Sequence, residues 1–490
     1  MTLRPHAPGG NGDAPGTYRL LAGAETLLAL GLGFFRLGRN SLWLDEVFSF
    51  RFARDLGSML EHDGNGWLYY GLLSVWRVFG ESESALRSLS VLACAGAIPF
   101  AVGVGRRLFN EKVGLAAGLL LAVHPTLVFY AQEARGYALL LLLVSAASWC
   151  FLKGLEGRGR MIWVLYAGLS ALSLYVHVFG AFAVCAHAVA LCAWGMGRVM
   201  WKRAAGAWVG IALAGLPLLI FQPGEIHIGW LGGDPLGRAY PLARNLLGTG
   251  WLLAAFSFFG ALEAASAFSR RISPREDLPR TIVPILWVLV PFVLGFGISA
   301  AIMPVLLSRY LLFCLPPIAV LAAAGLLRLD RRLAAGGMLL LLFLAAVPLV
   351  KWYLLPDRKE DWRGLTAHVL AASEEGDAVA FHPPWVRAGF DYYMERQRAD
   401  PDRLRFPELL QGAALPQTGE RVSDLPFPDV RRLAELGARY RRIWLVRSHE
   451  IERLGRRAQG DFICGEMEKQ FRLRETRAFA GIILQRFERF

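Results

Sequence analysis

Blocks of apolar residues that are long enough to cross a lipid bilayer recur along most of this sequence. A helix needs about 20 apolar residues to span the hydrocarbon core of a membrane. Only 19% of the 490 residues are charged, whereas soluble domains carry about 25%. The sequence therefore predicts an all-α polytopic membrane protein with about 11 transmembrane helices. The expected spans are 18–37, 86–105, 113–130, 136–152, 161–177, 179–197, 206–221, 244–268, 281–302, 309–327 and 333–350.

Basic residues are concentrated in every second loop between these spans. The residues are Arg106, Arg107, Lys112, Lys153, Arg158, Arg160, Arg198, Lys202, Arg203, Arg270, Arg271, Arg275, Arg280, Arg328, Arg331 and Arg332. Because basic loops stay on the cytoplasmic side of a membrane, we expect a cytoplasmic N-terminus and an extracytoplasmic C-terminal segment. Residues 1–17, rich in Gly and Pro, are expected to form a disordered cytoplasmic tail.

Two long segments fall on the expected outer side. The first is the loop 38–85, in which 49–60 and 67–79 have the pattern of amphipathic helices that lie along the membrane interface. The second is 351–490, a length sufficient for one hydrophobic core. It alternates polar helical stretches, such as 429–442, with apolar, strand-like runs at 378–381, 443–446 and 481–485. We therefore predict a transmembrane domain over 18–350 and a small soluble α/β domain over 351–490.

Composition excludes several classes of function. The net charge is +13, but the basic residues sit in short loops and form no stripe with interleaved aromatics, which argues against nucleic-acid binding. Of the six cysteines, only Cys464 lies in the soluble segment, and none has zinc-ligand spacing. A phosphate-binding loop of the ATPase type is absent from the sequence. So is the series of intramembrane acidic residues that proton-coupled transporters use.

The adjacent carboxylates Asp45 and Glu46 follow the first expected span. Two acidic groups at a membrane boundary are costly unless they are solvated or used. A carboxylate placed there could take a proton from a hydroxyl or bind a divalent metal. A solvated loop is the alternative interpretation.

Other polar residues lie at outer ends of expected spans. Glu133 and Arg135 occupy one short turn, and Arg309 with Tyr310 begins a later span. Arginine binds phosphate through its planar fork of donors. The alternatives are that Glu133 and Arg135 neutralise each other, and that Arg309 extends to the interface.

Two further motifs have structural interpretations. His177 lies at the outer junction of the expected spans 161–177 and 179–197, where a histidine is more often a hydrogen-bonded structural residue than a ligand. Residues 359–363, Lys-Glu-Asp-Trp-Arg, begin the soluble segment and have the pattern of a solvated helix start, with Trp362 anchored at the interface.

Several motifs together resemble the GT-C glycosyltransferases, in particular the bacterial branch related to protein mannosyltransferases and aminoarabinose transferases. The motifs are Leu42-Trp43-Leu44-Asp45-Glu46, Asn65-Gly66-Trp67-Leu68-Tyr69-Tyr70, Leu86-Arg87-Ser88-Leu89-Ser90, Gly105-Arg106-Arg107-Leu108-Phe109, Tyr130-Ala131-Gln132-Glu133-Ala134-Arg135, Leu174-Tyr175-Val176-His177, Ser308-Arg309-Tyr310 and Glu360-Asp361-Trp362-Arg363. The resemblance runs from about residue 18 to 365 with the order of motifs preserved; beyond about 390 the chain resembles nothing known to us.

The resemblance implies an enzyme of the bacterial plasma (inner) membrane that uses a sugar on a polyprenyl phosphate. It assigns the base to Asp45, with Glu46 in support, and the donor phosphate to Arg135, Arg309 and Tyr310. Residues that line the cavity would be Glu133, Tyr137, His177, Asn65 and Tyr69. No cofactor is certain; a divalent metal on Glu46, Glu133 and His177 is one option. The acceptor could be a glycan, a lipid or a protein, and membrane lipids are expected partners.

Two other functions are compatible with the sequence. A non-catalytic protein that binds or translocates lipid-linked sugars would need the arginines but no base. A small-solute transporter would instead show uptake driven by an ion gradient.

Overall fold

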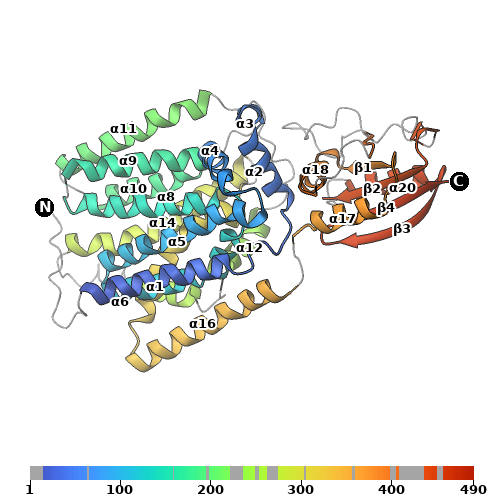
Figure 1. The fold of residues 1–490 in the computed structure, drawn as a ribbon. Helices are drawn as coiled ribbons and strands as arrows, with labels where there is room; N and C mark the ends of the chain where they lie inside the picture. The colour runs from blue at the N-terminus through green and yellow to red at the C-terminus, as the bar shows by residue number, and fades with distance from the viewer. Residues whose placement is uncertain are drawn as a thin grey trace. The chain divides into compact units, whose positions relative to one another are not determined.

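The computed structural model describes residues 15–62, 66–157, 159–194, 198–220, 235–248, 253–261, 274–302, 305–355, 359–397, 404–407, 435–436, 438–449 and 456–490. The described chain forms two compact units (Figure 1). One is helical and contains Asp55–Pro223 and Gly233–Leu354 together with the N-terminal helix. The other joins Gly38–Arg54 to Leu355–Phe490. We call them the helical unit and the tail unit.

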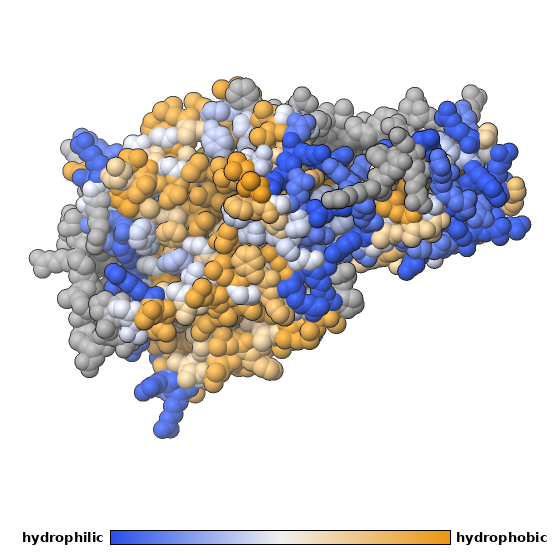
Figure 2. Space-filling model, viewed as in Figure 1, coloured by the Kyte–Doolittle hydropathy of each residue, from blue (hydrophilic) through white to orange (hydrophobic). Residues whose placement is uncertain are grey.

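The helical unit is a bundle of long apolar helices. Their bounds are α1 (Pro15–Phe34), α3 (Leu56–His62), α4 (Trp67–Trp76), η1 (Arg77–Phe79), α5 (Glu83–Leu108), α6 (Glu111–Ala122), α7 (Pro125–Ala131), α8 (Tyr137–Leu155), α9 (Gly159–Val176), α10 (Gly180–Trp194), α11 (Arg198–Ile220), α12 (Pro235–Leu247), α14 (Pro274–Ala301), η3 (Ser308–Cys314), α15 (Leu315–Leu326) and α16 (Arg331–Leu354). Figure 2 shows a largely hydrophobic surface over this unit, as expected for a surface that faces lipid.

The number of membrane spans among the described residues differs from the expected eleven. Seven helices are long and apolar enough to cross a membrane, or eight with the pair α6 and α7 counted as one span. That pair bends by 57° where Pro125 follows His124. The apolar helix α10 is too short to meet the same standard, and α1 is not among the helices that meet it. The expected span 244–268 lies partly outside the described residues. The chain is thus a multi-pass membrane protein, but a count of eleven is not confirmed.

Glycine allows two helices of the bundle to approach closely. A Cβ on Gly114 of α6 would come within 2.6 Å of the Val102 carbonyl oxygen of α5. On the opposite side, a Cβ on Gly105 would lie 2.9 Å from the Gly114 Cα. Small residues at such crossings let backbones pack in direct contact, which is how membrane helices commonly associate.

The tail unit contains a four-stranded sheet of order β1-β2-β4-β3. The strands are β1 (Ala378–His382), β2 (Arg442–Ser448), β3 (Phe471–Phe479) and β4 (Ile482–Arg489), and the helices are α2 (Leu44–Arg54), α17 (Trp362–Ala372), η4 (Pro384–Val386), α18 (Arg387–Arg396) and α20 (Arg456–Glu468). β1 runs parallel to β2, whereas β4 is antiparallel to both β2 and β3. The three expected strands are present, and β3 was not expected. Most of the expected helix 429–442 lies outside the described residues.

Trp362 belongs to the core of the tail unit. Its side chain is fully buried and packs on Gly389 of α18, where an added Cβ would come within 2.4 Å of the indole. The interpretation of Trp362 as an anchor at the membrane interface is therefore wrong, because the indole is covered by protein.

Candidate active site

Arg135 lies in the turn between α7 and α8 and is held by aromatic hydroxyls. Its guanidinium donates to the Tyr70 hydroxyl at 3.4 Å and to the Tyr137 hydroxyl at 3.3 Å. Its carbonyl oxygen accepts from the Ser90 hydroxyl at 3.3 Å. The turn begins at Gln132, the residue that caps the C-terminal end of α7. The side-chain amide of Gln132 donates to the Gly33 carbonyl oxygen of α1 at 2.9 Å, which attaches the turn to α1. The Arg135 side chain is thereby fixed in one orientation.

Arg309 approaches the same aromatic ring from η3. Its guanidinium carbon lies 6.0 Å from the centre of the Tyr137 ring and 5.5 Å from that of Tyr310, and the Arg135 guanidinium lies 5.6 Å from Tyr137. The two cations therefore share one tyrosine, an arrangement that stabilises both through the electron-rich ring face. We call Arg135, Tyr137, His177, Arg309 and Tyr310 the arginine cluster.

His177 completes the cluster. Its ring lies 4.8 Å from that of Tyr310 and 6.2 Å from that of Tyr137, and its Nδ1 accepts from the Phe179 backbone N–H at 3.3 Å. Burial, followed by the positive charges of Arg135 and Arg309, lowers the pKa of His177 to about 3. The imidazole is therefore neutral at physiological pH, and the positive charge of the cluster belongs to the two arginines.

The remaining expected residues of the helical unit lie around this cluster. Tyr69 is buried on α4, with its ring 5.9 Å from that of Tyr70. Glu133 is buried in the same turn as Arg135, whose backbone N–H donates to the Glu133 carbonyl oxygen at 2.9 Å. Asn65 lies outside the described residues. Tyr70 was not among the expected site residues, although it belongs to the same sequence motif as Tyr69.

The acidic pair lies in the tail unit, at the start of α2. Asp45 is half-buried in the first helical turn, where the helix dipole favours a negative charge. Glu46 is fully buried. One of its carboxylate oxygens accepts from the Trp43 backbone N–H at 3.3 Å and lies 3.6 Å from the Lys359 ammonium. Glu46 thus fixes the turn in which Asp45 lies.

Residues 359–363 hold the segment around this acidic pair. A Glu360 carboxylate oxygen accepts from the Leu44 backbone N–H at 3.1 Å. The Arg363 guanidinium donates to the Arg39 carbonyl oxygen at 2.6 Å, and its backbone N–H donates to the Ser41 hydroxyl at 3.0 Å. Residues 359–363 do begin a helix, because Asp361 caps the N-terminus of α17. The expectation that this helix start is solvated is wrong: Lys359 and Trp362 are buried, and Glu360 and Arg363 bind the backbone that precedes Asp45. We call 359–363 the clamp.

No group of three or more His, Cys, Asp or Glu side chains is placed to bind a metal in the part of the chain that the structure describes. Glu46, one of the three residues considered for a metal, instead faces Lys359.

The helical bundle with its small α/β unit has the fold of the GT-C glycosyltransferases. Residues 68–224 match the family model described as dolichyl-phosphate-mannose-protein mannosyltransferase. ArnT from Cupriavidus metallidurans in the apo state aligns with a TM-score of 0.65 and 14% identity, covering 97% of this chain and 98% of that chain. The resemblance in sequence and the similarity in fold agree.

Two further similar structures were solved with a bound lipid phosphate. ArnT from Cupriavidus metallidurans bound to undecaprenyl phosphate aligns with a TM-score of 0.61 and 13% identity over 96% of this chain and 98% of that chain. The oligosaccharyltransferase AglB from Archaeoglobus fulgidus, in complex with an inhibitory peptide and a dolichol-phosphate, aligns with a TM-score of 0.50 and 12% identity over 93% and 72%. No curated protein sequence matches the chain.

Proposed function

We propose that this protein transfers a sugar from a polyprenyl-phosphate donor to an acceptor hydroxyl on the extracytoplasmic side of a bacterial plasma membrane, with inversion at the sugar. The observation that carries the proposal is the arginine cluster, in which two guanidinium groups share Tyr137. The similar proteins support it, because undecaprenyl phosphate and dolichol-phosphate are named as ligands of ArnT and AglB.

The donor phosphate would bind at Arg135 and Arg309. When the sugar is displaced, negative charge grows on the phosphate oxygen that it leaves. Guanidinium groups that are already oriented stabilise such charge without reorganising, and they do so most strongly where water is excluded. The hydroxyls of Tyr70 and Tyr137 hold Arg135 in place, and neutral His177 adds no positive charge that would repel the two arginines.

The acceptor hydroxyl would be activated by Asp45. Its carboxylate takes the hydroxyl proton while the acceptor oxygen attacks the anomeric carbon. The bond from that carbon to the phosphate oxygen breaks, and polyprenyl phosphate leaves with the electron pair. A single displacement of this kind inverts the anomeric centre. Glu46, Lys359 and the rest of the clamp position Asp45 and do not take part in the chemistry.

The test is turnover of a polyprenyl-phosphate sugar by the purified protein. We expect Arg135→Gln and Arg309→Gln to lower kcat by about 10² to 10³, the loss seen when one donor to a developing oxyanion is removed. Asp45→Asn should lower it by about 10² or more. Charge-matched controls are Arg332→Gln at the far end of α16 and Glu375→Gln, an exposed carboxylate of the tail unit; both should retain wild-type turnover.

Full activity of Asp45→Asn would remove the base from the proposal, and full activity of both arginine variants would remove the phosphate site. If the donor binds to the wild type but is never turned over with any acceptor, the protein is a carrier or receptor of lipid-linked sugars.

A further inference from the structure

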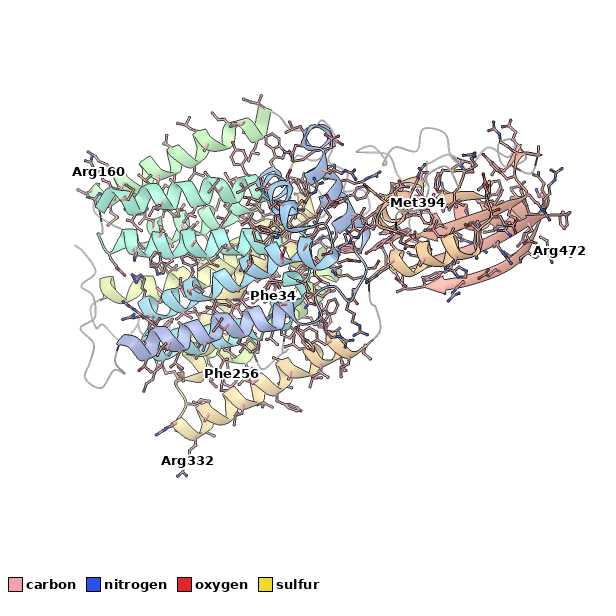
Figure 3. The ribbon with its side chains drawn as sticks, in the orientation of Figure 1. Phe34, Arg160, Phe256, Arg332, Met394 and Arg472 are labelled. Carbon is pink, nitrogen blue, oxygen red and sulfur yellow. The ribbon has the colours of Figure 1, made fainter. Side chains whose placement is uncertain are left out.

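A second basic site lies at the end of the bundle opposite to the arginine cluster. It is a cavity of about 520 Å³ between α1, α5 and α8. Three of the residues that line it are arginines, Arg19, Arg106 and Arg107. Figure 3 shows Arg160 of α9 and Arg332 of α16 projecting at this same end. The basic loops predict that this end is cytoplasmic.

Among the residues that the structure describes, the wall of the cavity carries positive charge and no carboxylate. Arg106 is paired with Glu111 at 2.9 Å, and Arg107 lies 3.6 Å from Glu156, but neither acid lines the cavity. Among the described residues Arg19 has no ion-pair partner. The cavity therefore presents a positive charge that a bound anion would neutralise.

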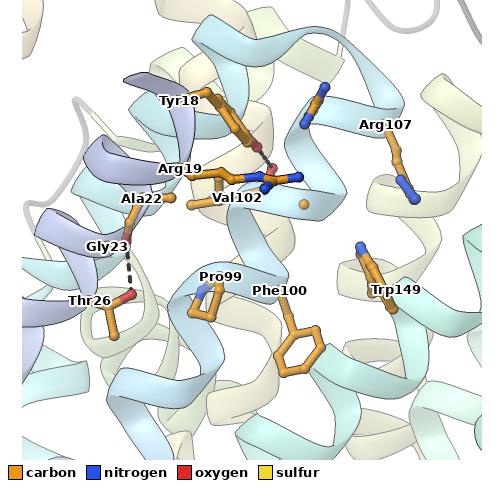
Figure 4. Close-up of a pocket in the computed structure, with 12 residues that line it drawn as sticks. Tyr18, Arg19, Ala22, Gly23, Thr26, Pro99, Phe100, Val102, Arg107 and Trp149 are labelled. Atoms are coloured by element: carbon orange, nitrogen blue, oxygen red, sulfur yellow. Dashed lines mark hydrogen bonds between the residues drawn. The ribbon is translucent and has the colours of Figure 1, made fainter. Parts of the chain in front are cut away.

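Aromatic rings hold two of these arginines in fixed orientations. The Arg106 guanidinium lies 4.6 Å from the centre of the Tyr18 ring, and that of Arg107 lies 5.2 Å from Trp149. A guanidinium that stacks on a ring keeps its N–H groups in its own plane, where they remain able to bind phosphate oxygens. Figure 4 shows Arg19 and Arg107 on opposite sides of the cavity.

The floor of the cavity is apolar. Pro99 and Phe100 form it below the arginines (Figure 4), and the nearby Thr26 hydroxyl is already bonded to the Ala22 carbonyl oxygen at 2.9 Å. On the outer face of α1, Leu20 and Leu27 are 75% and 68% exposed. A ligand of this site would therefore have a phosphate at one end and hydrocarbon at the other.

We propose that this cavity binds the headgroup phosphate of an anionic phospholipid of the cytoplasmic leaflet. Basic pockets between membrane helices on this side commonly select such lipids. The phosphate lies among Arg19, Arg106 and Arg107, and the first part of an acyl chain follows Pro99 and Phe100. The site is separate from the proposed catalytic one and does not depend on it.

The test is native mass spectrometry of the purified chain titrated with phosphatidylglycerol and with phosphatidylcholine. We expect the wild type to prefer phosphatidylglycerol. Each arginine near a lipid surface contributes about fivefold to affinity. The double variant Arg19→Gln/Arg106→Gln should therefore bind phosphatidylglycerol about 30-fold more weakly than the wild type. Arg332→Gln, which removes a basic residue outside the cavity, should change nothing.

A second pair of variants blocks the cavity without changing charge. Gly23 lines the cavity and Gly31 lies outside it on the same helix, and an added Cβ meets nothing within 4 Å at either position. Gly23→Phe should abolish the preference for phosphatidylglycerol, whereas Gly31→Phe should preserve it. Unfolding temperatures of all variants identify any that fail to fold.

If Arg19→Gln/Arg106→Gln and Gly23→Phe both prefer phosphatidylglycerol to phosphatidylcholine as strongly as the wild type does, the proposed binding site is wrong. A different result is that the wild type binds the two lipids equally and binds inorganic phosphate in a way that depends on the arginines. That result would contradict a lipid as the source of the phosphate and would identify a soluble phosphate compound as the ligand.

Discussion

At the scale of residues, the buried pair of Glu46 and Lys359 governs the position of Asp45. Their side chains are 0% and 7% exposed and lie 3.6 Å apart. Removing one member of such a pair leaves the other charge buried without compensation, whereas replacing both is tolerated much better. The family resemblance placed Glu46 in support of the base because it stands next to Asp45 in the chain. Its partner Lys359 is more than 300 residues away, so the ion pair could not be predicted from the sequence.

We expect Lys359→Met to destabilise the tail unit by about 3 kcal/mol. Adding Glu46→Gln to that variant should recover most of the loss, because no charge is then left buried. Chemical unfolding of the single and double variants in detergent measures the coupling between the two sites. Additive losses would show that the two side chains do not depend on each other.

His177 predicts a pH dependence of stability. Its folded pKa of about 3 lies below the ordinary value of 6.5, so the unfolded chain binds the extra proton first. Stability contributed by the neutral imidazole is present above pH 6.5 and is lost as the pH falls toward 3, by up to about 1.4 kcal/mol per pH unit. His177→Asn, which keeps an acceptor for the Phe179 N–H, should flatten this slope in unfolding measured from pH 7 to pH 5. An unchanged slope would contradict the buried, neutral state of His177.

At the scale of elements, proline and glycine account for features that hydrophobic length does not. The expected continuous span 113–130 is two helices, α6 and α7, because Pro125 interrupts the backbone hydrogen bonds at that point. The break was predictable from the sequence, because Pro125 disfavours a continuous helix at that point. The close crossing of α5 and α6 was not predictable, since it depends on which helix faces Gly114.

Gly114→Leu should therefore push α5 and α6 apart. Its side chain would collide with the Val102 carbonyl, and overpacking of this kind costs about 1–3 kcal/mol. Gly206→Leu on α11 is the matched control, because a Cβ there meets nothing within 4 Å. Thermal unfolding in detergent should show a lower midpoint for Gly114→Leu alone. Equal midpoints for the two variants would mean that the crossing is not tightly packed.

At the scale of the whole molecule, local patterns were sufficient for the class of fold. Apolar blocks predicted the bundle, and short apolar, strand-like runs predicted β1, β2 and β4. β3 was missed because its exposed face carries charges such as Arg474 and Glu475. The grouping of Gly38–Arg54 with the tail unit was also missed. It rests on contacts such as Arg363 with Ser41, and no local pattern in either segment indicates its distant partner.

For the arginine cluster as well, some members could be predicted from the sequence and others depend on contacts between distant segments. Family resemblance named Arg135, Tyr137, His177, Arg309 and Tyr310, and the structure places their side chains together around Tyr137. Their roles remain predictions. Tyr70 and Ser90, which fix Arg135, became evident only from the packing of α4 and α5 against the turn.

The most direct test of the account is an experimental structure of the protein in lipid with undecaprenyl phosphate. We expect phosphate density at the arginine cluster, with phosphate oxygens about 3 Å from guanidinium nitrogens of both Arg135 and Arg309. Phosphate density bound elsewhere, with the cluster unoccupied under the same conditions, would contradict the assignment of these arginines to the donor.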